Sequence, residues 1–340
     1  MIKIAINGFG RIGRHSFKVA WTKKNLQIVA VNDIAESRVL AHLLKYDTAY
    51  PDFAPRVSHD EKHLIVGNKK IPVFAEKDPS FLPWKKLKVD VVLECTGKFT
   101  KKEGAELHLK AGAKKVVISA PSKGGAPTFV IGVNEKKYQG ETIISNASCT
   151  TNCVAPVMKA LEDVFGVRKA LLTTIHSYTA TQPLQDGPAK DLREARAAAQ
   201  NMVPTTTGAA VATALTIPEL AGKFDGLSVR VPTITVSLSD ITVLLKKKVT
   251  KDEVNAAFTK ASQGSMKGIL GVTSEPLVSS DFIGDARSAI VDLSLTYVVD
   301  GDLVKVIAWY DNEWGYANRL VEMAEIVCGH TVIPNGAKRS

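Results

Sequence analysis

Short apolar runs alternate with helix-like stretches in the first half of the chain. Apolar strands are expected at residues 3–7, 28–32, 89–94, 115–119 and 128–132, with helices after the first strand and at about 101–111. Buried strands separated by helices are typical of a parallel sheet that is covered on both faces. The pattern therefore predicts an α/β domain in residues 1–148.

The pattern changes after a helix expected at about residues 150–165. Longer alternating strands are expected at 168–176, 228–235, 241–247, 289–299 and 304–310, with helices at about 250–263 and 316–327. Alternating strands with few helices between them indicate a mostly antiparallel sheet. We predict an α+β domain in residues 149–315 and a C-terminal segment, 316–340, whose helix packs back on the first domain.

The first strand leads into a glycine-rich turn. Gly8, Gly10 and Gly13 form the pattern G-x-G-x-x-G between an expected strand and an expected helix. Such glycines allow a tight turn, close approach of the backbone to a pyrophosphate, and close packing of helix on strand. Asp33 lies 33 − 13 = 20 residues after the last glycine, where an acidic residue binds ribose hydroxyls and disfavours a 2′-phosphate. These features predict a Rossmann-type domain that binds NAD.

Two further strands of the first domain end in small or polar residues. Ligands of such sheets bind beyond the carboxyl ends of the strands. The residues predicted to line the cofactor site on this ground are Thr96, Gly97, Ser119 and Ala120. Cys95, at the end of its strand, is expected to be buried and unreactive.

Cys149 follows Ser148 at the expected start of a helix. Ser148 is a favourable N-cap. The orphan N–H groups and the dipole of a helix N-terminus favour an anion, so a thiolate is expected to form more easily there than in free cysteine. Cysteine is also among the most buried residue types and often packs as a small hydrophobe. The polar surroundings make Cys149 a candidate nucleophile, although its position alone leaves both interpretations open.

His176 ends a long apolar strand, 176 − 149 = 27 residues after the cysteine. A lone histidine is usually structural, but a nucleophilic cysteine needs an imidazole within hydrogen-bond reach to take its proton. A polar cluster that can donate to phosphate oxygens comprises Thr179, Thr181, Thr205, Thr206, Thr207, Gly208 and Arg230. Threonine is also common in strands, so this cluster by itself does not establish a phosphate site.

Composition narrows the class of protein. A chain of 340 residues with 45% hydrophobic content favours two globular domains. No apolar run is long enough to span a membrane, and the first strand begins directly after Met1, which leaves no room for a leader. We therefore expect a cytoplasmic protein. The net charge of +10 comes from scattered lysines without a recognition motif, so we expect no dedicated nucleic-acid partner.

The cysteine spacing argues against two other kinds of site. Four cysteines in a chain of this length do not make a disulfide framework, and no C-x-x-C spacing occurs. We predict no metal site. Cys149 and Cys153, at i and i+4, are at most a strained or regulatory pair.

Over essentially its whole length the chain resembles the phosphorylating glyceraldehyde-3-phosphate dehydrogenases. The resemblance is carried by residues 7–14 (NGFGRIGR), 145–156 (SNASCTTNCVAP), 176–182 (HSYTATQ), 207–210 (TGAA), 230–233 (RVPT) and 309–316 (WYDNEWGY). The stretch around Cys149 is nearly diagnostic by itself.

The resemblance implies a reaction. Cys149 would attack the aldehyde of D-glyceraldehyde 3-phosphate to give a thiohemiacetal, with His176 as the base that activates the thiol and assists hydride transfer to NAD. Inorganic phosphate would then cleave the thioester to yield 1,3-bisphosphoglycerate. Storage of the oxidation energy as a thioester needs a thiol and a cleft that excludes water. Such an enzyme serves glycolysis and gluconeogenesis.

The resemblance also assigns roles to individual residues. The substrate phosphate would lie near Thr179, Thr181 and Arg230, and the attacking phosphate near Ser148, Thr150, Thr207 and Gly208. Asn312 would hold the nicotinamide amide. The remaining cofactor contacts implied are Arg11, Ile12, Asp33, Lys77 and Ser119. Members of the family are usually homotetramers, in which a loop at about residues 190–204 reaches a neighbour's cofactor, and Pro188 with Asp33 matches the members that use NAD.

One position departs from the family. Many members carry two adjacent arginines in this loop, and the second helps to bind the attacking phosphate. Here the order is Arg193-Glu194, with Arg196 two residues further on. Either a neighbouring arginine substitutes or phosphate binding is weaker.

Three other functions fit parts of the sequence. The nearest is erythrose-4-phosphate dehydrogenase, in which water completes the reaction; retention of Thr207-Gly208 favours phosphate instead. A Cys/His hydrolase is allowed by the order of Cys149 and His176, but it would leave the dinucleotide domain without a purpose. A basic Rossmann protein that binds nucleic acid would show affinity that depends steeply on salt and survives loss of Cys149.

Overall fold

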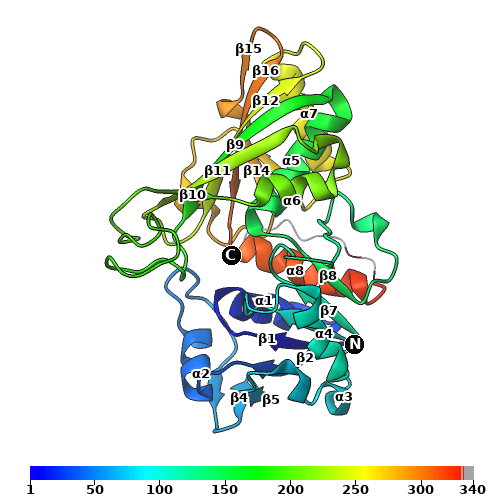
Figure 1. Cartoon of the computed structure of the whole chain (residues 1–340), viewed down its shortest axis with the longest axis vertical. Coiled ribbons are helices and arrows are strands. Elements are labelled where there is room, and N and C mark those ends of the chain that lie inside the picture. Colours follow the sequence, from blue (N-terminus) through cyan, green and yellow to red (C-terminus); the bar gives the residue numbers. More distant parts are fainter. Residues whose placement is uncertain (331, 333–340) are drawn as a thin grey trace. The chain divides into compact units, whose positions relative to one another are not determined.

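The computed structural model describes residues 1–330 and 332. The chain divides into two compact units (Figure 1). The first contains the described residues of 1–129, 136–147 and 317–332, and the second contains 130–135 and 148–316.

An eight-stranded sheet forms the core of the first unit, in the order β3-β4-β5-β2-β1-β6-β7-β8. Its strands are β1 (Ile2–Asn7), β2 (Leu26–Asn32), β3 (Val57–His59), β4 (His63–Val66), β5 (Lys69–Phe74), β6 (Val91–Glu94), β7 (Lys115–Ile118) and β8 (Ile143–Ser145). The neighbouring strands in the row β5-β2-β1-β6-β7-β8 are all parallel to one another. Every residue of β6 is buried. Burial of both faces explains why these strands read as continuous apolar runs, and the predicted parallel α/β sheet is confirmed.

The helices of the first unit are α1 (Arg11–Thr22), α2 (Ser37–Lys45), α3 (Trp84–Leu87), α4 (Lys102–Lys110) and most of α8 (Trp314–Val327). Glu325 of α8 accepts from Lys23 at 2.9 Å and from Asn25 at 2.6 Å, so this helix is tied to the loop after α1.

Two expectations for this unit differ from the structure. Residues 128–132 were expected to be a strand, but only Thr128 forms an isolated bridge, to Ser145. The backbone turns instead because Asn134 Oδ1 accepts the Val130 N–H at 2.8 Å and Gly132 takes a φ of +84°. The antiparallel pairs β3–β4 and β4–β5 were not predicted, because strands of three, four and six residues carry little periodicity.

The second unit is built on another eight-stranded sheet, in the order β10-β11-β9-β12-β16-β14-β13, with β15 paired to β16. The strands are β9 (Val167–Ser177), β10 (Val203–Thr206), β11 (Phe224–Val231), β12 (Ser237–Leu245), β13 (Leu270–Thr273), β14 (Ala289–Asp292), β15 (Tyr297–Val299) and β16 (Leu303–Tyr310). Most neighbours are antiparallel, as predicted; β11 with β9 and β13 with β14 are parallel.

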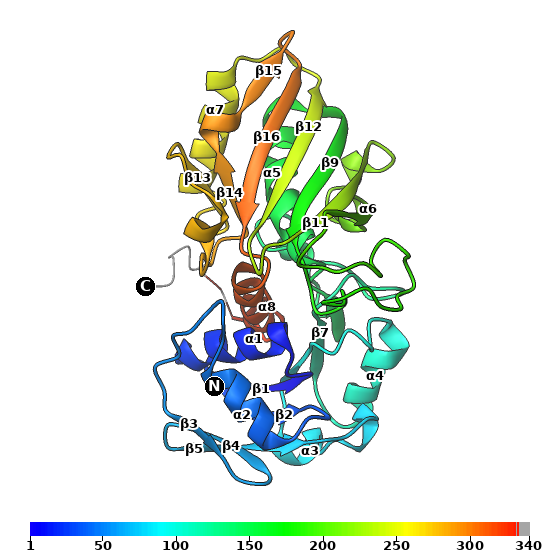
Figure 2. The ribbon, with the colours of Figure 1, turned by 90° about the vertical axis from the view of Figure 1, so that its left-hand side faces the viewer.

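Helices lie on one face of this sheet. They are α5 (Cys149–Phe165), α6 (Ala209–Thr216) and α7 (Lys251–Gln263). Figure 2 shows α5 behind the long strands while the opposite face is open to the viewer. The alternation along β12, buried and half-buried in turn, follows from this one-sided cover. On the open face Leu171 is 65% exposed and Leu227 45% exposed.

Two strand predictions in the second unit differ from the structure in length or position. Residues 289–299 form two strands because Asp292 accepts from the N–H and hydroxyl of Ser294 and starts a 3₁₀ turn. The strand expected at 228–235 is instead Phe224–Val231. Helix α6 was not predicted, since its alanine- and threonine-rich sequence has little amphipathic pattern.

Candidate active site

Cys149 is the first residue of α5, and His176 lies near the end of β9. Ser148 starts the helix by accepting the Thr151 N–H at 3.1 Å, as expected for an N-cap. The structure brings the two candidate catalytic side chains together, with Cys149 Sγ 3.5 Å from His176 Nε2. The pair therefore has the separation that proton transfer between thiol and imidazole requires.

The second ring nitrogen of His176 has two partners. Nδ1 lies 2.7 Å from the carbonyl oxygen of Ser177 and 2.6 Å from Nη1 of Arg230. A single nitrogen cannot donate to the carbonyl and accept from the guanidinium at the same time. The tautomer of His176 thus depends on which of the two contacts prevails.

Burial controls the charges of this pair. It raises the pKa of the Cys149 thiol, and the positive charge of Arg230 and the hydrogen bonds of Thr150 offset only part of that rise. Burial, followed by the charge of Arg230, lowers the pKa of His176 to about 3. For each group taken by itself, desolvation disfavours the charged form, and for the thiol it opposes the stabilisation of an anion that the helix N-terminus offers. Easier formation of the Cys149 thiolate stays a prediction.

A chain of hydroxyl groups lies beside the catalytic pair and was not found from the sequence. Tyr310 Oη is 2.9 Å from Thr150 Oγ1 and 2.9 Å from Thr174 Oγ1. The Tyr310 ring contacts the His176 ring edge-on, at 6.0 Å between centroids. Thr174 and His176 are two residues apart and therefore lie on the same face of β9. Strand periodicity could have identified Thr174, but no local signal identifies Tyr310.

Asn312 is held in one orientation. Its Oδ1 accepts from Ser177 Oγ at 3.1 Å and from Ser237 Oγ at 3.0 Å. With both hydroxyls donating to Oδ1, Nδ2 is the end that can donate to a ligand. This is the orientation that recognition of a carboxamide oxygen needs.

The phosphate-binding candidates fall into separate groups. Thr179 Oγ1 and Thr181 Oγ1 lie 2.9 Å apart. Thr207 accepts the Ala209 N–H at the start of α6, for which Gly208 is the N-cap. In the described part of the chain no hydrogen bond joins Thr207 or Gly208 to Cys149, His176 or Arg230.

The glycine loop of the first unit has the geometry that its sequence predicts. Gly8 has a φ of +89°, and a Cβ there would lie 2.7 Å from the Thr96 nitrogen. A Cβ on Gly13 would lie 2.0 Å from the Gly8 carbonyl oxygen, whereas one on Gly10 would meet nothing within 4 Å. Gly8 and Gly13 are therefore required by the protein itself, and the space beside Gly10 is available to a ligand.

Asp33 is fixed by backbone donors at the end of β2. Its Oδ2 accepts the Phe9 N–H at 2.7 Å and its Oδ1 accepts the Ala35 N–H at 3.0 Å. The carboxylate is thereby joined directly to the glycine loop. These residues fit a dinucleotide, whose pyrophosphate would be bound at Gly10 and whose ribose would be bound by Asp33.

The other predicted cofactor residues vary in their surroundings. Arg11 forms an ion pair with Asp47 at 2.5 Å. Both the N–H and the hydroxyl of Thr96 donate to Glu94. Gly97 has a φ of +70°, and Ser119 donates its N–H to the Glu94 carbonyl. Ile12 is half-buried and Lys77 is exposed.

Comparison with known proteins identifies the relationship. Residues 2–102 match the NAD-binding domain of glyceraldehyde 3-phosphate dehydrogenase, and residues 148–312 match the C-terminal domain of that enzyme. Similar proteins include glyceraldehyde-3-phosphate dehydrogenase 1 of Bacillus cereus, 53% identical over 95% of this chain and 98% of the relative. Others are the glyceraldehyde-3-phosphate dehydrogenase of Geobacillus stearothermophilus, 51% identical over 96% and 98%, and enzyme 1 of Kluyveromyces lactis, 52% identical over 96% and 100%. The chain belongs to the glyceraldehyde-3-phosphate dehydrogenase family. Its first domain is the NAD-binding domain of these oxidoreductases.

Glu194, the departure from the family, has a partner that the sequence did not predict. Its Oε1 accepts from Thr205 Oγ1 at 2.9 Å. Arg196 does not pair with it, because its Nε donates to Asp186 at 2.7 Å. Glu194 is therefore anchored to β10 at Thr205, and Thr205 lies two residues before Thr207.

The second cysteine of α5 is buried away from solvent. Cys153 Sγ lies 3.7 Å from Ser239 Oγ, and burial raises its pKa to about 12. Cys95 was expected to be buried but is only half-buried, and desolvation raises the pKa of its thiol. All four cysteines are free thiols. Within residues 1–330 and 332 no three His, Cys, Asp or Glu side chains are grouped as metal ligands.

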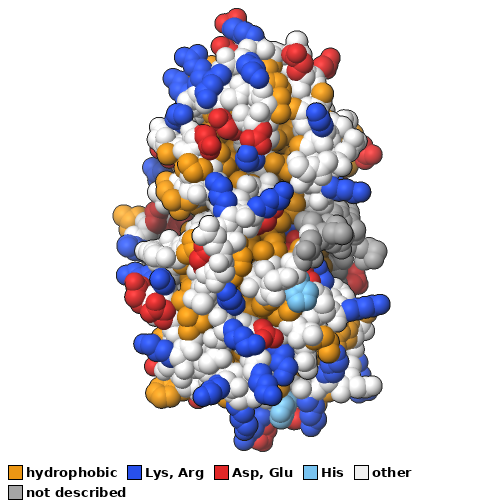
Figure 3. Space-filling model, turned by 90° about the vertical axis from the view of Figure 1, so that its right-hand side faces the viewer, with side chains coloured by type: hydrophobic (Ala, Val, Ile, Leu, Met, Phe, Trp, Pro, Cys, Tyr) orange, Lys and Arg blue, Asp and Glu red, His pale blue; other side chains and the backbone are white. Residues whose placement is uncertain are grey.

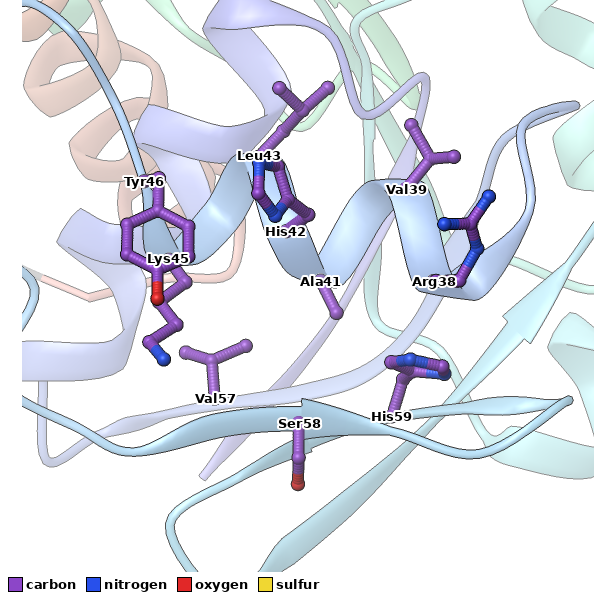
Figure 4. A pocket seen from close by; sticks show the side chains of 10 residues that line it. All are labelled: Arg38, Val39, Ala41, His42, Leu43, Lys45, Tyr46, Val57, Ser58 and His59. Atoms are coloured by element: carbon purple, nitrogen blue, oxygen red, sulfur yellow. The ribbon is translucent and has the colours of Figure 1, made fainter.

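A cavity of about 430 Å³ lies between α2 and β3, away from every predicted site residue. Figure 4 shows Ala41, Val57 and His59 pointing into the space between helix and strand, while Ser58 points to the other side. Its basic lining residues, among them Arg38 and Lys45, are exposed side chains on a shallow surface. This cavity is not part of the candidate active site.

The surface charge is dispersed. Figure 3 shows one face, on which Lys and Arg side chains are scattered and outnumber the acidic ones. In the part of the chain that the structure describes, no helix is both long and apolar enough to span a bilayer.

Proposed function

We propose that this protein catalyses the NAD-dependent oxidative phosphorylation of D-glyceraldehyde 3-phosphate to 1,3-bisphosphoglycerate. The observation that carries the proposal is the contact between Cys149 Sγ and His176 Nε2 at 3.5 Å, in a chain of this family. Under this proposal residues 1–148 bind the cofactor, residues 149–315 carry the chemistry, and the C-terminal helix supports the first domain.

The catalytic pair acts on the aldehyde carbon. Cys149 Sγ forms a bond to this carbon while its proton passes to His176 Nε2 and on to the carbonyl oxygen, giving a thiohemiacetal. His176 then takes the hydroxyl proton as the hydride leaves the carbon, which becomes a thioester. NAD supplies the hydride acceptor. A phosphate oxygen next attacks the thioester carbon, the C–S bond breaks, and His176 returns the proton to the leaving thiolate.

Binding roles follow from donors near this pair. We assign the substrate phosphate to Thr179, Thr181 and Arg230, because the guanidinium and two hydroxyls offer charge-assisted hydrogen bonds. The attacking phosphate is assigned to Ser148, Thr150, Thr207 and Gly208. Asn312 Nδ2 is the proposed donor to the nicotinamide amide.

Cofactor contacts are proposed at the ends of the parallel strands. They comprise Gly8, Gly10, Arg11, Ile12, Gly13, Asp33, Lys77, Thr96, Gly97 and Ser119. The Asp33 carboxylate, held by two backbone N–H groups, supports NAD over NADP because a 2′-phosphate would meet its charge.

We also propose a cytoplasmic homotetramer. The open face of the second sheet supports self-association, since it exposes Leu171 on β9, Leu227 on β11 and Leu303 on β16. Contiguous exposed apolar side chains mark interaction surfaces. Light scattering of the purified protein would test the assembly.

The decisive test is NADH formation from glyceraldehyde 3-phosphate with and without inorganic phosphate. The proposal expects rapid turnover only when phosphate is present. Phosphate-independent oxidation of erythrose 4-phosphate would instead favour the alternative, which the relatives named above do not support.

A further inference from the structure

A buried polar chain runs across the carboxyl ends of β6, β1 and β2 in the first unit. It begins at Trp84 of α3, passes through His108 of α4 to Glu94 of β6, and continues through Asn7 of β1 to Asn32 of β2. Each of these five residues is at most 4% exposed. The catalytic mechanism uses none of them.

The hydrogen bonds of this chain assign the proton of His108. Trp84 Nε1 is only a donor, and it lies 3.0 Å from His108 Nδ1, so Nδ1 must be the acceptor. Nε2 therefore carries the hydrogen and donates to Glu94 Oε2 at 3.0 Å. Trp84 thus holds the neutral imidazole in one tautomer and aims its N–H at the carboxylate.

Glu94 distributes this constraint to two strand ends. Its Oε1 accepts the Thr96 N–H at 2.8 Å and also the Thr96 hydroxyl. Its Oε2 accepts from Asn7 Nδ2 at 2.6 Å. Asn7 is the residue before Gly8, so one carboxylate fixes both Thr96 and the start of the glycine loop.

Asn32 extends the constraint to the third strand end. Its Nδ2 donates to Asn7 Oδ1 at 2.7 Å, and its Oδ1 accepts the Glu76 N–H at 2.9 Å. Asn32 directly precedes Asp33. The chain therefore ends beside Gly8, Asp33 and Thr96, the proposed contacts of the dinucleotide.

We propose that His108, locked in its tautomer by Trp84, is a positioning residue for the dinucleotide cofactor. It keeps Glu94 oriented so that the three strand ends present Gly8, Asp33 and Thr96 in a fixed arrangement before the cofactor arrives. Preorganisation of this kind increases the affinity for the cofactor, because a site that is not preorganised must be ordered on binding and this ordering costs free energy. The inference rests on the proposed cofactor contacts and is independent of the aldehyde substrate.

The test compares His108→Leu with His108→Gln, using calorimetric titration with NAD alone. Leucine removes both contacts, and we expect the NAD dissociation constant to rise about tenfold, the change that one unmade buried hydrogen bond produces. Glutamine restores affinity, because its amide can donate to Glu94 and accept from Trp84. His63→Leu is the control, since His63 pairs with Asp60 at the surface and should leave NAD binding unchanged.

Kinetics separate positioning from simple stabilisation. His108→Leu should raise the KM for NAD with kcat and the KM for the aldehyde nearly unchanged, whereas a merely structural residue would lower the melting temperature without this selective effect. A folded His108→Leu protein with wild-type NAD affinity would overturn the inference. If that variant does not fold, Trp84→Phe, which deletes the indole N–H, gives the answer: weaker NAD binding supports the inference and unchanged binding refutes it.

Failure of the proposed function can be distinguished from failure of the inference about His108. If the protein binds NAD but does not oxidise glyceraldehyde 3-phosphate, the activity assignment fails while the titration result still decides the role of His108.

Discussion

His108 of the first unit and His176 of the second are both buried, but their Nδ1 atoms have different hydrogen-bond partners. Nδ1 of His108 faces the donor Trp84 and must accept, so the proton lies on Nε2, which contacts the Glu94 carboxylate and, at 3.3 Å, Asn7 Nδ2. His176 of the second unit has both an acceptor and a donor against the same Nδ1, and Nε2 faces a thiol. A fully satisfied imidazole holds neighbouring groups still, whereas an imidazole with competing partners can exchange a proton.

The contrast extends to the residues around each histidine. In the first unit Asp33, Asn7 and Glu94 have their oxygens occupied by the protein's own donors. In the second, among the residues that the structure describes, the buried Nε of Arg230 has no partner. The proposed cofactor contacts in the first unit are therefore prebuilt by the protein's own donors, while Arg230 in the second keeps a donor that could serve a phosphate.

The most damaging change removes the thiol. Cys149→Ser should abolish turnover, because a serine hydroxyl is a far weaker nucleophile and no thioester can form. Since the first unit is untouched, NAD binding should persist. Steady-state assays and NAD titration of the same preparation test both halves, and near-normal turnover would remove the central claim.

The next largest effect is expected from replacing His176, whose Nδ1 has two competing partners. His176→Asn should lower kcat by roughly 10²–10⁴-fold, the usual contribution of a general base. The variant should also react more slowly with iodoacetate at neutral pH, because the burial-raised pKa of Cys149 leaves its thiol dependent on a nearby proton acceptor. His108→Gln serves as the matched control, and equal alkylation rates in all three proteins would show that His176 does not activate the thiol.

The prebuilt unit was largely predictable from sequence. Parallel strands buried on both faces produce continuous apolar runs, and the glycine spacing with Asp33 locates the cofactor loop from local pattern alone. What could not be predicted is the chain from Trp84 to Asn32, because its members come from five separate elements and no local pattern links a tryptophan to an asparagine across the sheet.

The catalytic unit was less predictable. Helix geometry placed Cys149 at an N-terminus, but the pKa of the thiol depends on burial, which no local pattern reports. Tyr310 reaches the pair only through pairing of β16 with β12, and Arg230 through pairing of β11 with β9. These long-range registers also explain why the roles of the threonines and of Asn312 were drawn from family resemblance.

Cofactor choice tests the prebuilt unit with a smaller effect. Replacing Asp33 by Gly together with Pro188 by Ser should shift preference towards NADP by a few kcal/mol at most, on the order of the repulsion between two charges in a solvated groove. Asp33→Gly also frees the Phe9 N–H and weakens binding of both cofactors. The measurement is therefore the ratio of kcat/KM for NADP to that for NAD. A wild-type enzyme equally efficient with both would contradict the proposed role of Asp33.

The smallest expected effect on kinetics comes from Glu194, an acidic residue in the unit that is proposed to bind phosphate. Glu194 accepts from Thr205, and Thr207 lies two residues further along the same segment. Its negative charge should raise the KM for inorganic phosphate, because it opposes an anion near the proposed attacking-phosphate site. Glu194→Arg should lower that KM several-fold, about the change that a partly screened charge produces.

Glu194→Gln is the matched control, because it removes the charge and keeps an oxygen that can accept from Thr205. If charge is the cause, the glutamine variant should fall between wild type and arginine, with the KM values for aldehyde and NAD nearly constant. Phosphate saturation curves at fixed pH and ionic strength decide the matter. Superimposable curves for all three proteins would place Glu194 outside the phosphate site. Because Arg196 is already paired with Asp186, Arg193 would then be the nearest remaining candidate in the loop for the cation that binds the attacking phosphate.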